Sequence, residues 1–294
     1  MKCYHHNDAD GRCAAAIVAK AHGAWSQEQP FDPESIEFIE MDYSRVVDVD
    51  SIKPDEEVVI VDFSFKPEVM IEVMKRTRNI VWIDHHKSCA QYPYAAENIN
   101  GLRDFNDKGW SGCELAWRFY FGTLKTSPIP PPLGVDLIGD YDSWRLKRVP
   151  ASLDFRAGIE IEDQSPLSPM WPELFNNSEK TVEIVQNGKI CIRYRDRFCQ
   201  DFMKQFGFET ELAGVRAYAC NFYRYGSPGF GERFKAYPMC IAFAFDGTRF
   251  TVSLYSEDPD VDCAEIAKIY GGGGHRGAAG FVCSQLPFFP VGAR

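Results

Sequence analysis

The sequence predicts an α/β fold: an N-terminal domain built on a parallel sheet with helices on both faces, followed by a smaller C-terminal α/β domain. Two short, nearly continuous apolar runs carry this prediction, EVVIVDF at residues 57–63 and NIVWID at residues 79–84. Such runs, without alternation of polar residues, are typical of strands buried on both faces of a parallel sheet. Residues 67–76 between them have a helical pattern, so the three segments predict a strand–helix–strand unit.

The other elements of the first half are indicated by periodicity and by capping residues. A short N-terminal strand leads to His6, and residues 10–21 predict a helix with alanines, Ile17 and Val18 on its apolar face. Ser111 as an N-cap, with Glu114 three residues later, predicts a helix at residues 111–121. A further helix is expected to end at Gly139, just before the acidic segment 140–142.

The second half begins with a long helical pattern and then changes to strands. Residues 178–205 predict a helix that could connect two domains, and strands are predicted at 213–220, 238–245, 249–255 and near Phe281. A helix is expected at 261–270, before a glycine-rich segment at 271–280. The predicted domains are therefore residues 1–180, with a linker helix region from about residue 150, and residues 181–294.

Composition limits the classes of partner. The net charge of −10 argues against a broad basic surface for long nucleic acid, although it allows a small anionic substrate bound through metal ions. The 10 cysteines form no C-x-x-C pair, which favours reduced thiols over disulfides or a zinc site. The N-terminus has no apolar leader, and no run approaches the ~20 apolar residues that span a bilayer. We therefore expect a cytoplasmic protein with no membrane partner.

Four short acidic or histidine-containing motifs stand at the ends of predicted strands or at turns. They are His6-Asn7-Asp8-Ala9-Asp10-Gly11, Asp62, Asp84-His85-His86 and Asp140-Tyr141-Asp142. Taken singly, an aspartate after a strand is usually a turn or capping residue, and adjacent histidines are usually solvated. The strands of a parallel sheet, however, all end along one edge, so the side chains of Asp8, Asp10, Asp62, Asp84 and His85 are expected to converge there.

Converging carboxylates repel one another unless cations neutralise them. Carboxylate and imidazole ligands suit Mn²⁺, with Mg²⁺ or Co²⁺ as the other candidates, and two such ions could hold a phosphoryl group and activate a water. The sequence therefore predicts two divalent metal ions at this edge of the sheet.

The glycine-rich segment GGGGHRGAAG at residues 271–280 is the second strong motif. Consecutive glycines offer backbone N–H groups without side-chain obstruction, and His275 and Arg276 add donors suited to phosphate. A flexible linker would not explain the His-Arg pair followed by two alanines and a glycine, so an anion-binding loop is favoured.

These motifs resemble, in order along nearly the whole chain, those of the DHH phosphoesterases. Asp84-His85-His86 is the signature that gives the family its name, and residues 271–280 look like the glycine motif of its C-terminal DHHA1 domain. Among the members of the family, the chain is most similar to nanoRNase-type oligoribonucleases.

The resemblance implies a role for each matching residue. The metal ligands would be His6, Asp8, Asp10, Asp62, His85 and Asp140, with Asp62 bridging the two ions and His5 as an alternative to His6. The catalytic residues would be His86, which faces the substrate, Asp62, and Asp84, which supports the histidines. Substrate would be held across an interdomain cleft by Gly272, Gly273, Gly274, His275 and Arg276.

One position departs from the family pattern. Relatives often carry Ser-Leu-Arg-Ser before the glycine motif, whereas residues 253–256 here read Ser-Leu-Tyr-Ser. Tyr255 cannot supply the positive charge of the arginine, so recognition of a terminal phosphate would fall to Arg276, Arg249 or Arg233. Tyr255 itself would stack on a base or pack in the core.

The function expected from the resemblance is hydrolysis of short oligonucleotides to mononucleotides by a water that two metal ions activate. The alternatives are a 3′-phosphoadenosine 5′-phosphate phosphatase, a cyclic or linear dinucleotide phosphodiesterase, and an exopolyphosphatase. A catalytically inactive nucleotide-binding module is a further alternative, although every acidic motif is retained. The expected partner is a short oligonucleotide or nucleotide and not long nucleic acid, and homodimer formation is left open.

Overall fold

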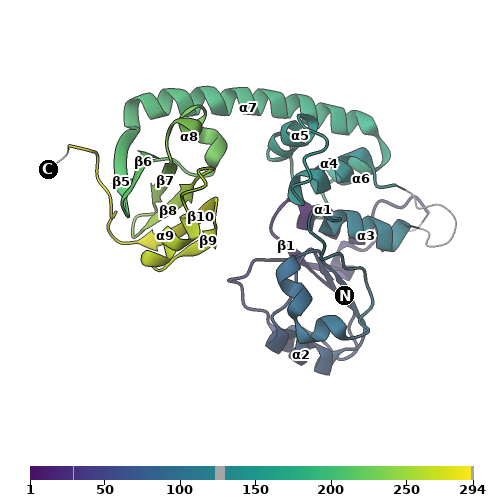
Figure 1. The fold of residues 1–294 in the computed structure, drawn as a ribbon. Coiled ribbons are helices and arrows are strands. Elements are labelled where there is room, and N and C mark those ends of the chain that lie inside the picture. Colours follow the sequence, from purple (N-terminus) through teal and green to yellow (C-terminus); the bar gives the residue numbers. More distant parts are fainter. Residues whose placement is uncertain (29, 123–129, 293–294) are drawn as a thin grey trace. The chain divides into compact units, whose positions relative to one another are not determined.

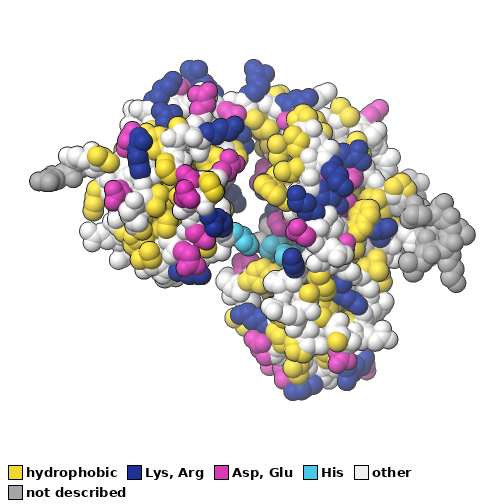
Figure 2. All heavy atoms as spheres, in the orientation of Figure 1, with side chains coloured by type: hydrophobic (Ala, Val, Ile, Leu, Met, Phe, Trp, Pro, Cys, Tyr) yellow, Lys and Arg dark blue, Asp and Glu magenta, His cyan; other side chains and the backbone are white. Residues whose placement is uncertain are grey.

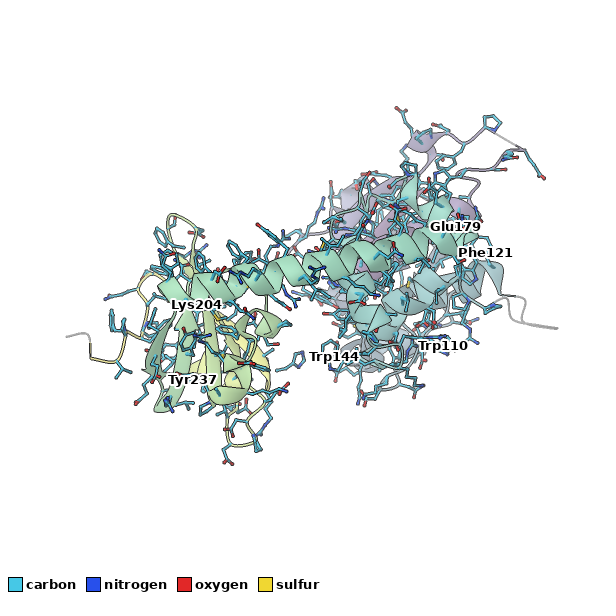
Figure 3. The ribbon with its side chains drawn as sticks, turned by 90° about the horizontal axis from the view of Figure 1, so that it is seen from above. Trp110, Phe121, Trp144, Glu179, Lys204 and Tyr237 are labelled. Atoms are coloured by element: carbon cyan, nitrogen blue, oxygen red, sulfur yellow. The ribbon has the colours of Figure 1, made fainter. Side chains whose placement is uncertain are left out.

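The computed structural model describes residues 1–28, 30–122 and 130–292 and divides into two compact units (Figure 1). The N-terminal unit is Met1–Ile190 and the C-terminal unit is Cys191–Arg294. The division falls inside a single long helix, α7 (Ser178–Phe206), whose two ends lie near Glu179 and Lys204 in Figure 3. The domain boundary predicted near residue 180 lies within the same helix.

The N-terminal unit is built on a parallel sheet with the strand order β2-β1-β3-β4. The two apolar runs form its buried strands β3 and β4, as predicted, because every side chain of both strands is enclosed. The edge strand β2 was not predicted. The strands are β1 (Lys2–His6), β2 (Glu37–Met41), β3 (Val58–Val61) and β4 (Ile80–Ile83).

Helices cover both faces of this sheet. On one face, Val59 and Ile83 pack with α1 and α3 in a single apolar cluster. On the other face, Ile60 and Trp82 pack with α2, which Figure 1 draws on the opposite side of the sheet from α1 and α3. The predicted fold class is confirmed for this unit. The helices are α1 (Ala9–Ala21), α2 (Pro67–Arg76) and α3 (Gly112–Phe121).

The register of the sheet places the ends of three strands side by side. His5 of β1 pairs with Val61 of β3, and Val61 pairs with Ile83 of β4. The next residues along the chain are His6, which is the last residue of β1, and Asp62 and Asp84, which follow β3 and β4. All three therefore lie at the same edge of the sheet.

Further α-helices follow β4 and α3 in the described part of the N-terminal unit. Helix α5 crosses the first part of α7 at two glycines, since a Cβ on Gly158 would lie 2.0 Å from the carbonyl oxygen of Ile184, and one on Gly188 would lie 1.6 Å from that of Asp154. The backbones therefore approach more closely than any larger residue would allow. The helices are α4 (Leu133–Asp142), α5 (Ala151–Ile159), α6 (Met170–Asn176) and the N-terminal part of α7.

The C-terminal unit is a mixed sheet with the strand order β5-β6-β7-β8-β10-β9. Strands β6 and β7 are parallel, and the other neighbours are antiparallel. This confirms the predicted α/β character of the C-terminal half. The elements are β5 (Phe208–Leu212), β6 (Val215–Cys220), α8 (Arg233–Ala236), β7 (Met239–Phe245), β8 (Phe250–Tyr255), α9 (Cys263–Ile269), β9 (Gly273–His275) and β10 (Ala278–Cys283).

The glycine-rich segment is a hairpin and not the loop that we predicted. Gly273–His275 form the edge strand β9, which pairs with β10, and Gly274 has φ +143°, a conformation that favours glycine. The Arg276 guanidinium donates to the carbonyl oxygen of Pro259. Because β9 has a neighbour on one side alone, its other backbone edge is exposed.

Several predictions from composition can be compared with the structure. All 10 cysteines, which fall within the described residues, have free thiols. Among the described residues, no helix combines the length and the apolar character needed to span a membrane. On the face drawn in Figure 2, the described Lys and Arg side chains are interspersed with Asp and Glu over each unit, without a broad basic tract.

Candidate metal centre

The centre lies at the edge of the N-terminal sheet where β1, β3 and β4 end. Asp62 directly follows β3 and has φ +52°, a left-handed conformation that is uncommon for a residue with a side chain. Its backbone N–H still donates to the carbonyl oxygen of Ile83, at 2.9 Å. Backbone strain of this kind is concentrated at functional sites, where the surrounding structure enforces it.

The first group of converging side chains is His6, Asp8 and Asp62. His6 Nδ1 lies 2.8 Å from Asp8 Oδ2 and 3.8 Å from Asp62 Oδ2. Despite the short distance to Asp8, His6 Nδ1 is not aligned for a hydrogen bond and has no such partner. Burial raises the pKa of Asp8, but the adjacent His6 imidazole and the Gly11 N–H outweigh it and lower that pKa below its ordinary value.

Asp8 is held in place by the start of α1. It is the N-cap of that helix, and its Oδ1 accepts from the backbone N–H of Gly11 at 2.9 Å. Gly11 must lack a side chain, because a Cβ there would lie 2.4 Å from the carbonyl oxygen of His6. His5, the alternative to His6, is buried, and its Nδ1 donates to the carbonyl oxygen of His6 at 2.9 Å.

The second group is Asp10, His85 and Asp142. His85 Nε2 lies 3.2 Å from Asp142 Oδ2 and 3.7 Å from Asp10 Oδ2. Asp142 is the last residue of α4. Its burial and the nearby charges of Asp10 and Asp8 raise its pKa well above the ordinary range.

Asp62 is common to both groups. Its Oδ2 faces His6, and its Oδ1 lies 3.0 Å from His85 Nε2. The side chain is 1% exposed, yet neither oxygen has a hydrogen-bond partner. Burial and the charges of Asp10 and Asp8 raise the pKa of Asp62 well above the ordinary value. Buried carboxylate oxygens almost always have partners, so this environment fits a carboxylate that binds divalent cations on both sides.

Asp84 positions the two histidines, His85 and His86, through hydrogen bonds. Its Oδ1 accepts from the backbone N–H of His85 at 2.8 Å and from His86 Nδ1 at 2.7 Å, and its Oδ2 accepts from Ser64. Burial lowers the pKa of His86, but the hydrogen bond to Asp84 and the surrounding carboxylates outweigh it and raise that pKa to about 9. His86 Nδ1 lies 4.0 Å from Asp62 Oδ1.

Asp10 is held by the N-terminus of α3. Its carboxylate accepts from the backbone N–H groups of Gly112 at 2.7 Å and Cys113 at 3.0 Å, and from the Ser111 hydroxyl at 2.9 Å. These contacts satisfy N–H groups that have no partner inside the helix and leave Asp10 Oδ2 facing His85. Gly112 also lets Asp62 approach, since a Cβ there would lie 2.5 Å from that of Asp62.

The structure places Asp142, and not the predicted Asp140, in this cluster. Both oxygens of Asp140 are used elsewhere: they accept from the backbone N–H groups of Lys147 at 2.9 Å and Arg148 at 3.0 Å. The helix that we expected to end at Gly139 continues to Asp142, and residues two apart on a helix face different directions. Asp140 therefore fixes the chain that follows α4.

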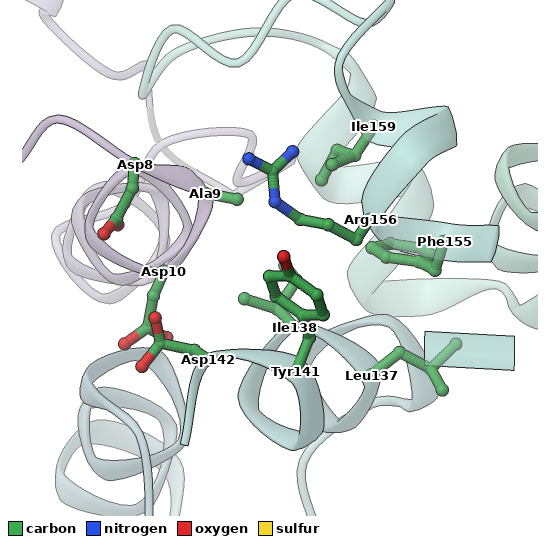
Figure 4. Close-up of a pocket in the computed structure, with 10 residues that line it drawn as sticks. All are labelled: Asp8, Ala9, Asp10, Leu137, Ile138, Tyr141, Asp142, Phe155, Arg156 and Ile159. Carbon is green, nitrogen blue, oxygen red and sulfur yellow. The ribbon is translucent and has the colours of Figure 1, made fainter. Parts of the chain in front are cut away.

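A cavity adjoins the cluster within the N-terminal unit, and Tyr141 and Arg156 line it together with Asp8 and Asp142 (Figure 4). Neither Tyr141 nor Arg156 was predicted from the sequence as a site residue. The proposed substrate residues all belong to the C-terminal unit; they are Gly272, Gly273, Gly274, His275 and Arg276. Tyr255 lies with its ring centroid 6.3 Å from that of Phe230, at the border of an apolar cluster.

Comparison with known proteins finds a family match for the first part of the chain. Residues 2–135 match a family model described as the DHH family, N-terminal domain. An uncharacterized protein of Acanthamoeba polyphaga mimivirus is 25% identical over 246 residues, which cover 80% of this chain and 56% of that protein. The chain thus spans little more than half the length of this relative.

Two solved structures share the fold at low sequence identity. The DHH domain of a member of a family of ribosomal proteins has a TM-score of 0.59 and 14% identity, covering 96% of this chain and 82% of that one. The pGpG-specific phosphodiesterase PggH from Vibrio cholerae has a TM-score of 0.53 and 14% identity, covering 96% and 92%. At this level of identity, the similarity concerns the fold.

Proposed function

We propose, from the match of residues 2–135 to the N-terminal domain of the DHH family, that the protein is a metal-dependent phosphodiesterase that hydrolyses short oligonucleotides to mononucleotides. The observation that carries the proposal is Asp62, a buried carboxylate whose two oxygens face two different histidines and have no hydrogen-bond partner. A pair of divalent cations, with Mn²⁺ as the first candidate, would satisfy both oxygens.

The ligands divide between two positions. His6, Asp8 and Asp62 would hold one cation, and Asp10, His85, Asp142 and Asp62 would hold the other. When bound, such a pair supplies an activated water and stabilises negative charge on a phosphoryl group. Asp62 would set the spacing of the two positions, since its rigid backbone follows a buried strand.

Two residues beside the ligands would contribute in different ways, His86 on the substrate side and Asp84 by orienting the histidines. Asp84 fixes the imidazole of His86 through Nδ1, which leaves Nε2 as the nitrogen that can face the scissile phosphate. A protonated His86 would donate a hydrogen bond to a phosphate oxygen or to the departing sugar oxygen. Asp84 itself is enclosed and has both oxygens occupied, so its role would be to orient His85 and His86.

The charge of the chain favours short substrates, and the C-terminal unit would supply donors for a substrate phosphate. With 42 acidic and 32 basic residues, the chain lacks the excess of positive charge that holds long nucleic acid. The exposed hairpin carrying Gly272, Gly273, Gly274, His275 and Arg276 would supply backbone N–H groups and a guanidinium for a substrate phosphate. The fold shared with PggH adds the linear dinucleotide pGpG to the candidate substrates.

A panel of substrates with Mn²⁺ tests the proposal. It would compare pGpG, a second linear dinucleotide, a long RNA, a cyclic dinucleotide, 3′-phosphoadenosine 5′-phosphate and polyphosphate. We expect the linear dinucleotides to have the highest kcat/KM. Preferential hydrolysis of polyphosphate or of the monoester would contradict the substrate assignment.

The variant Asp62→Asn tests the role of the bridging carboxylate. Loss of residues that merely orient ligands costs about 10–100-fold, so removal of a shared ligand should lower turnover by more than about 100-fold. Asp50→Asn is the matched control, because Asp50 is 88% exposed and pairs with Arg76 at the surface. Near-normal turnover in folded Asp62→Asn would refute the bridging role.

A further inference from the structure

The cavity beside the candidate metal centre is lined in part by residues that do not belong to the two metal-binding groups. It has a volume of about 150 Å³ and lies between the start of α1, the end of α4 and helix α5, all in the N-terminal unit (Figure 4). One end is formed by Asp8, Asp10 and Asp142, which belong to the two metal-binding groups. A substrate phosphate bound at those groups would therefore have its neighbouring moiety at the cavity.

The wall of the cavity is apolar. Leu137, Ile138, Phe155 and Ile159 line it, and all four side chains are buried. A chain of inorganic phosphates has no apolar surface to place against such a wall, whereas a nucleoside has a planar base and the carbon face of a sugar. The wall thus favours an organic phosphoester over polyphosphate or pyrophosphate.

Two polar side chains complete the lining, Tyr141 from α4 and Arg156 from α5. In Figure 4 both extend into the space between the two helices and the start of α1. The Arg156 guanidinium carbon lies 5.6 Å from the centre of the Tyr141 ring. An aromatic ring next to a guanidinium is an arrangement on which bases stack.

Arg156 has an exchangeable partner. It forms an ion pair with Glu160, the residue that follows α5, and the two side chains are 36% and 50% exposed. Exposed pairs of this kind contribute little to stability, so the guanidinium can leave Glu160 for a ligand. Arg145, also near the centre, is held by Glu114 at 2.8 Å and by the carbonyl oxygen of Gly109 at 3.0 Å.

We propose that this cavity binds the nucleoside next to the scissile phosphate, with the base against Tyr141 and the apolar wall and with Arg156 as its polar contact. The inference rests on the proposed phosphodiesterase function and names the part of the substrate that the N-terminal unit recognises. It makes Tyr141 and Arg156 specificity-determining residues for nucleotides.

Equilibrium binding to the Mn²⁺-loaded protein tests the cavity without turnover. Isothermal titration calorimetry would compare AMP, a nucleotide, with methylenediphosphonate, a phosphate-chain analogue without a nucleoside. In Tyr141→Leu the affinity for AMP should fall about tenfold, within the range measured for loss of one stacked base. The affinity for methylenediphosphonate should change less than about twofold, because it makes no contact with the ring.

Arg156→Gln is the second variant, and Arg197→Gln is its matched control. Arg197 forms the same type of ion pair with Asp201 four residues later, on α7 in the C-terminal unit. Arg156→Gln should weaken AMP binding about tenfold, as expected for a lost charged hydrogen bond, and Arg197→Gln should leave it unchanged. Thermal unfolding should be alike for both variants, because both remove one exposed ion pair.

The outcomes separate this inference from the proposed function. Equal weakening of both ligands in Tyr141→Leu, or no weakening of AMP binding in either cavity variant, would overturn the assignment of the cavity. If AMP binding weakens selectively but none of the phosphodiesters in the panel is hydrolysed, the nucleoside site stands and the proposed reaction fails. Hydrolysis of a dinucleotide with the KM unchanged in both variants would support the proposed reaction and contradict the nucleoside site.

Discussion

At the scale of single residues, the difference between Asp140 and Asp142 decides which carboxylate reaches the metal centre. The two residues lie about 200° apart around a helix, so they cannot face the same way. Asp142 faces His85 at 3.2 Å, and Asp140 binds the backbone N–H groups of Lys147 and Arg148. Asp142 therefore belongs to a group that could bind a cation, whereas Asp140 stabilises the backbone that follows α4.

Asparagine substitutions should separate these two roles. Asp142→Asn should lower Mn²⁺ affinity at least about tenfold, since it removes a charged ligand. Asp140→Asn should leave Mn²⁺ affinity within about twofold but lower the free energy of unfolding by about 1–3 kcal/mol, because a buried charged acceptor is lost. Metal titration and chemical denaturation measure the two effects. The opposite result, with Mn²⁺ binding lost in Asp140→Asn alone, would restore Asp140 as the ligand.

Most of the cluster was predictable because its residues follow strands that the sequence marks clearly. Asp62 and Asp84 end apolar runs. The choice between His5 and His6 stayed open in the sequence, and the structure groups His6 with Asp8 and Asp62. Asp142 was missed because its position depends on where α4 ends, and helix ends are poorly marked when no capping residue follows. Arg156 could not be found, since α5 comes near the centre through tertiary packing alone.

At the scale of elements, the N-terminus of α3 links the helix to the metal centre. Gly112 is the first residue of α3, and its backbone N–H donates to Asp10 while its missing side chain leaves room for Asp62. An alanine favours a helix over glycine by up to about 1 kcal/mol. At this position, however, the added Cβ would lie 2.5 Å from that of Asp62, which cannot move without its backbone.

Gly112→Ala should therefore damage the centre although it suits the helix. We expect a loss of about 1–3 kcal/mol in the free energy of unfolding from overpacking, and Mn²⁺ affinity lowered about tenfold by displacement of Asp62. Gly273→Ala is the control, because a Cβ there meets nothing within 4 Å. Metal titration and denaturant unfolding of both variants provide the measurement. Unchanged Mn²⁺ affinity in Gly112→Ala would show that Asp62 does not need its observed position.

Two strands that the sequence did not predict, β2 and β9, share a physical reason. Strand β2 is an edge strand whose residues, apart from Met41, are at least partly exposed, so it has no continuous apolar run. Strand β9 consists of two glycines and His275, and glycines give no strand signal, which is why a loop was expected. Buried β3 and β4 could be predicted because their pattern depends on burial, whereas β2 and β9 depend on pairing with a neighbour.

The two units of the chain can be observed separately in solution. The chain has 6 tryptophans, and every one precedes residue 191, so intrinsic tryptophan fluorescence reports on the N-terminal unit. They are Trp25, Trp82, Trp110, Trp117, Trp144 and Trp171. The net charge of −10 includes the buried carboxylates of the centre, whose mutual repulsion opposes folding of this unit unless cations are bound.

Mn²⁺ should therefore stabilise the N-terminal unit of the wild type. Asp62→Asn should instead stabilise the metal-free protein and reduce the stabilisation by Mn²⁺. In the wild type, Mn²⁺ at 100 times its Kd should raise the free energy of unfolding by about 2.7 kcal/mol over the protein in EDTA. Asp62→Asn removes one charge from the buried cluster, so this variant should be more stable than the wild type in EDTA and should gain little from Mn²⁺. Thermal unfolding followed by tryptophan fluorescence measures both effects. An equal rise in Tm with Mn²⁺ in both proteins would mean that the stabilising ions bind without Asp62. A lower Tm of the variant in EDTA would mean that the charge of Asp62 is compensated within the wild-type protein.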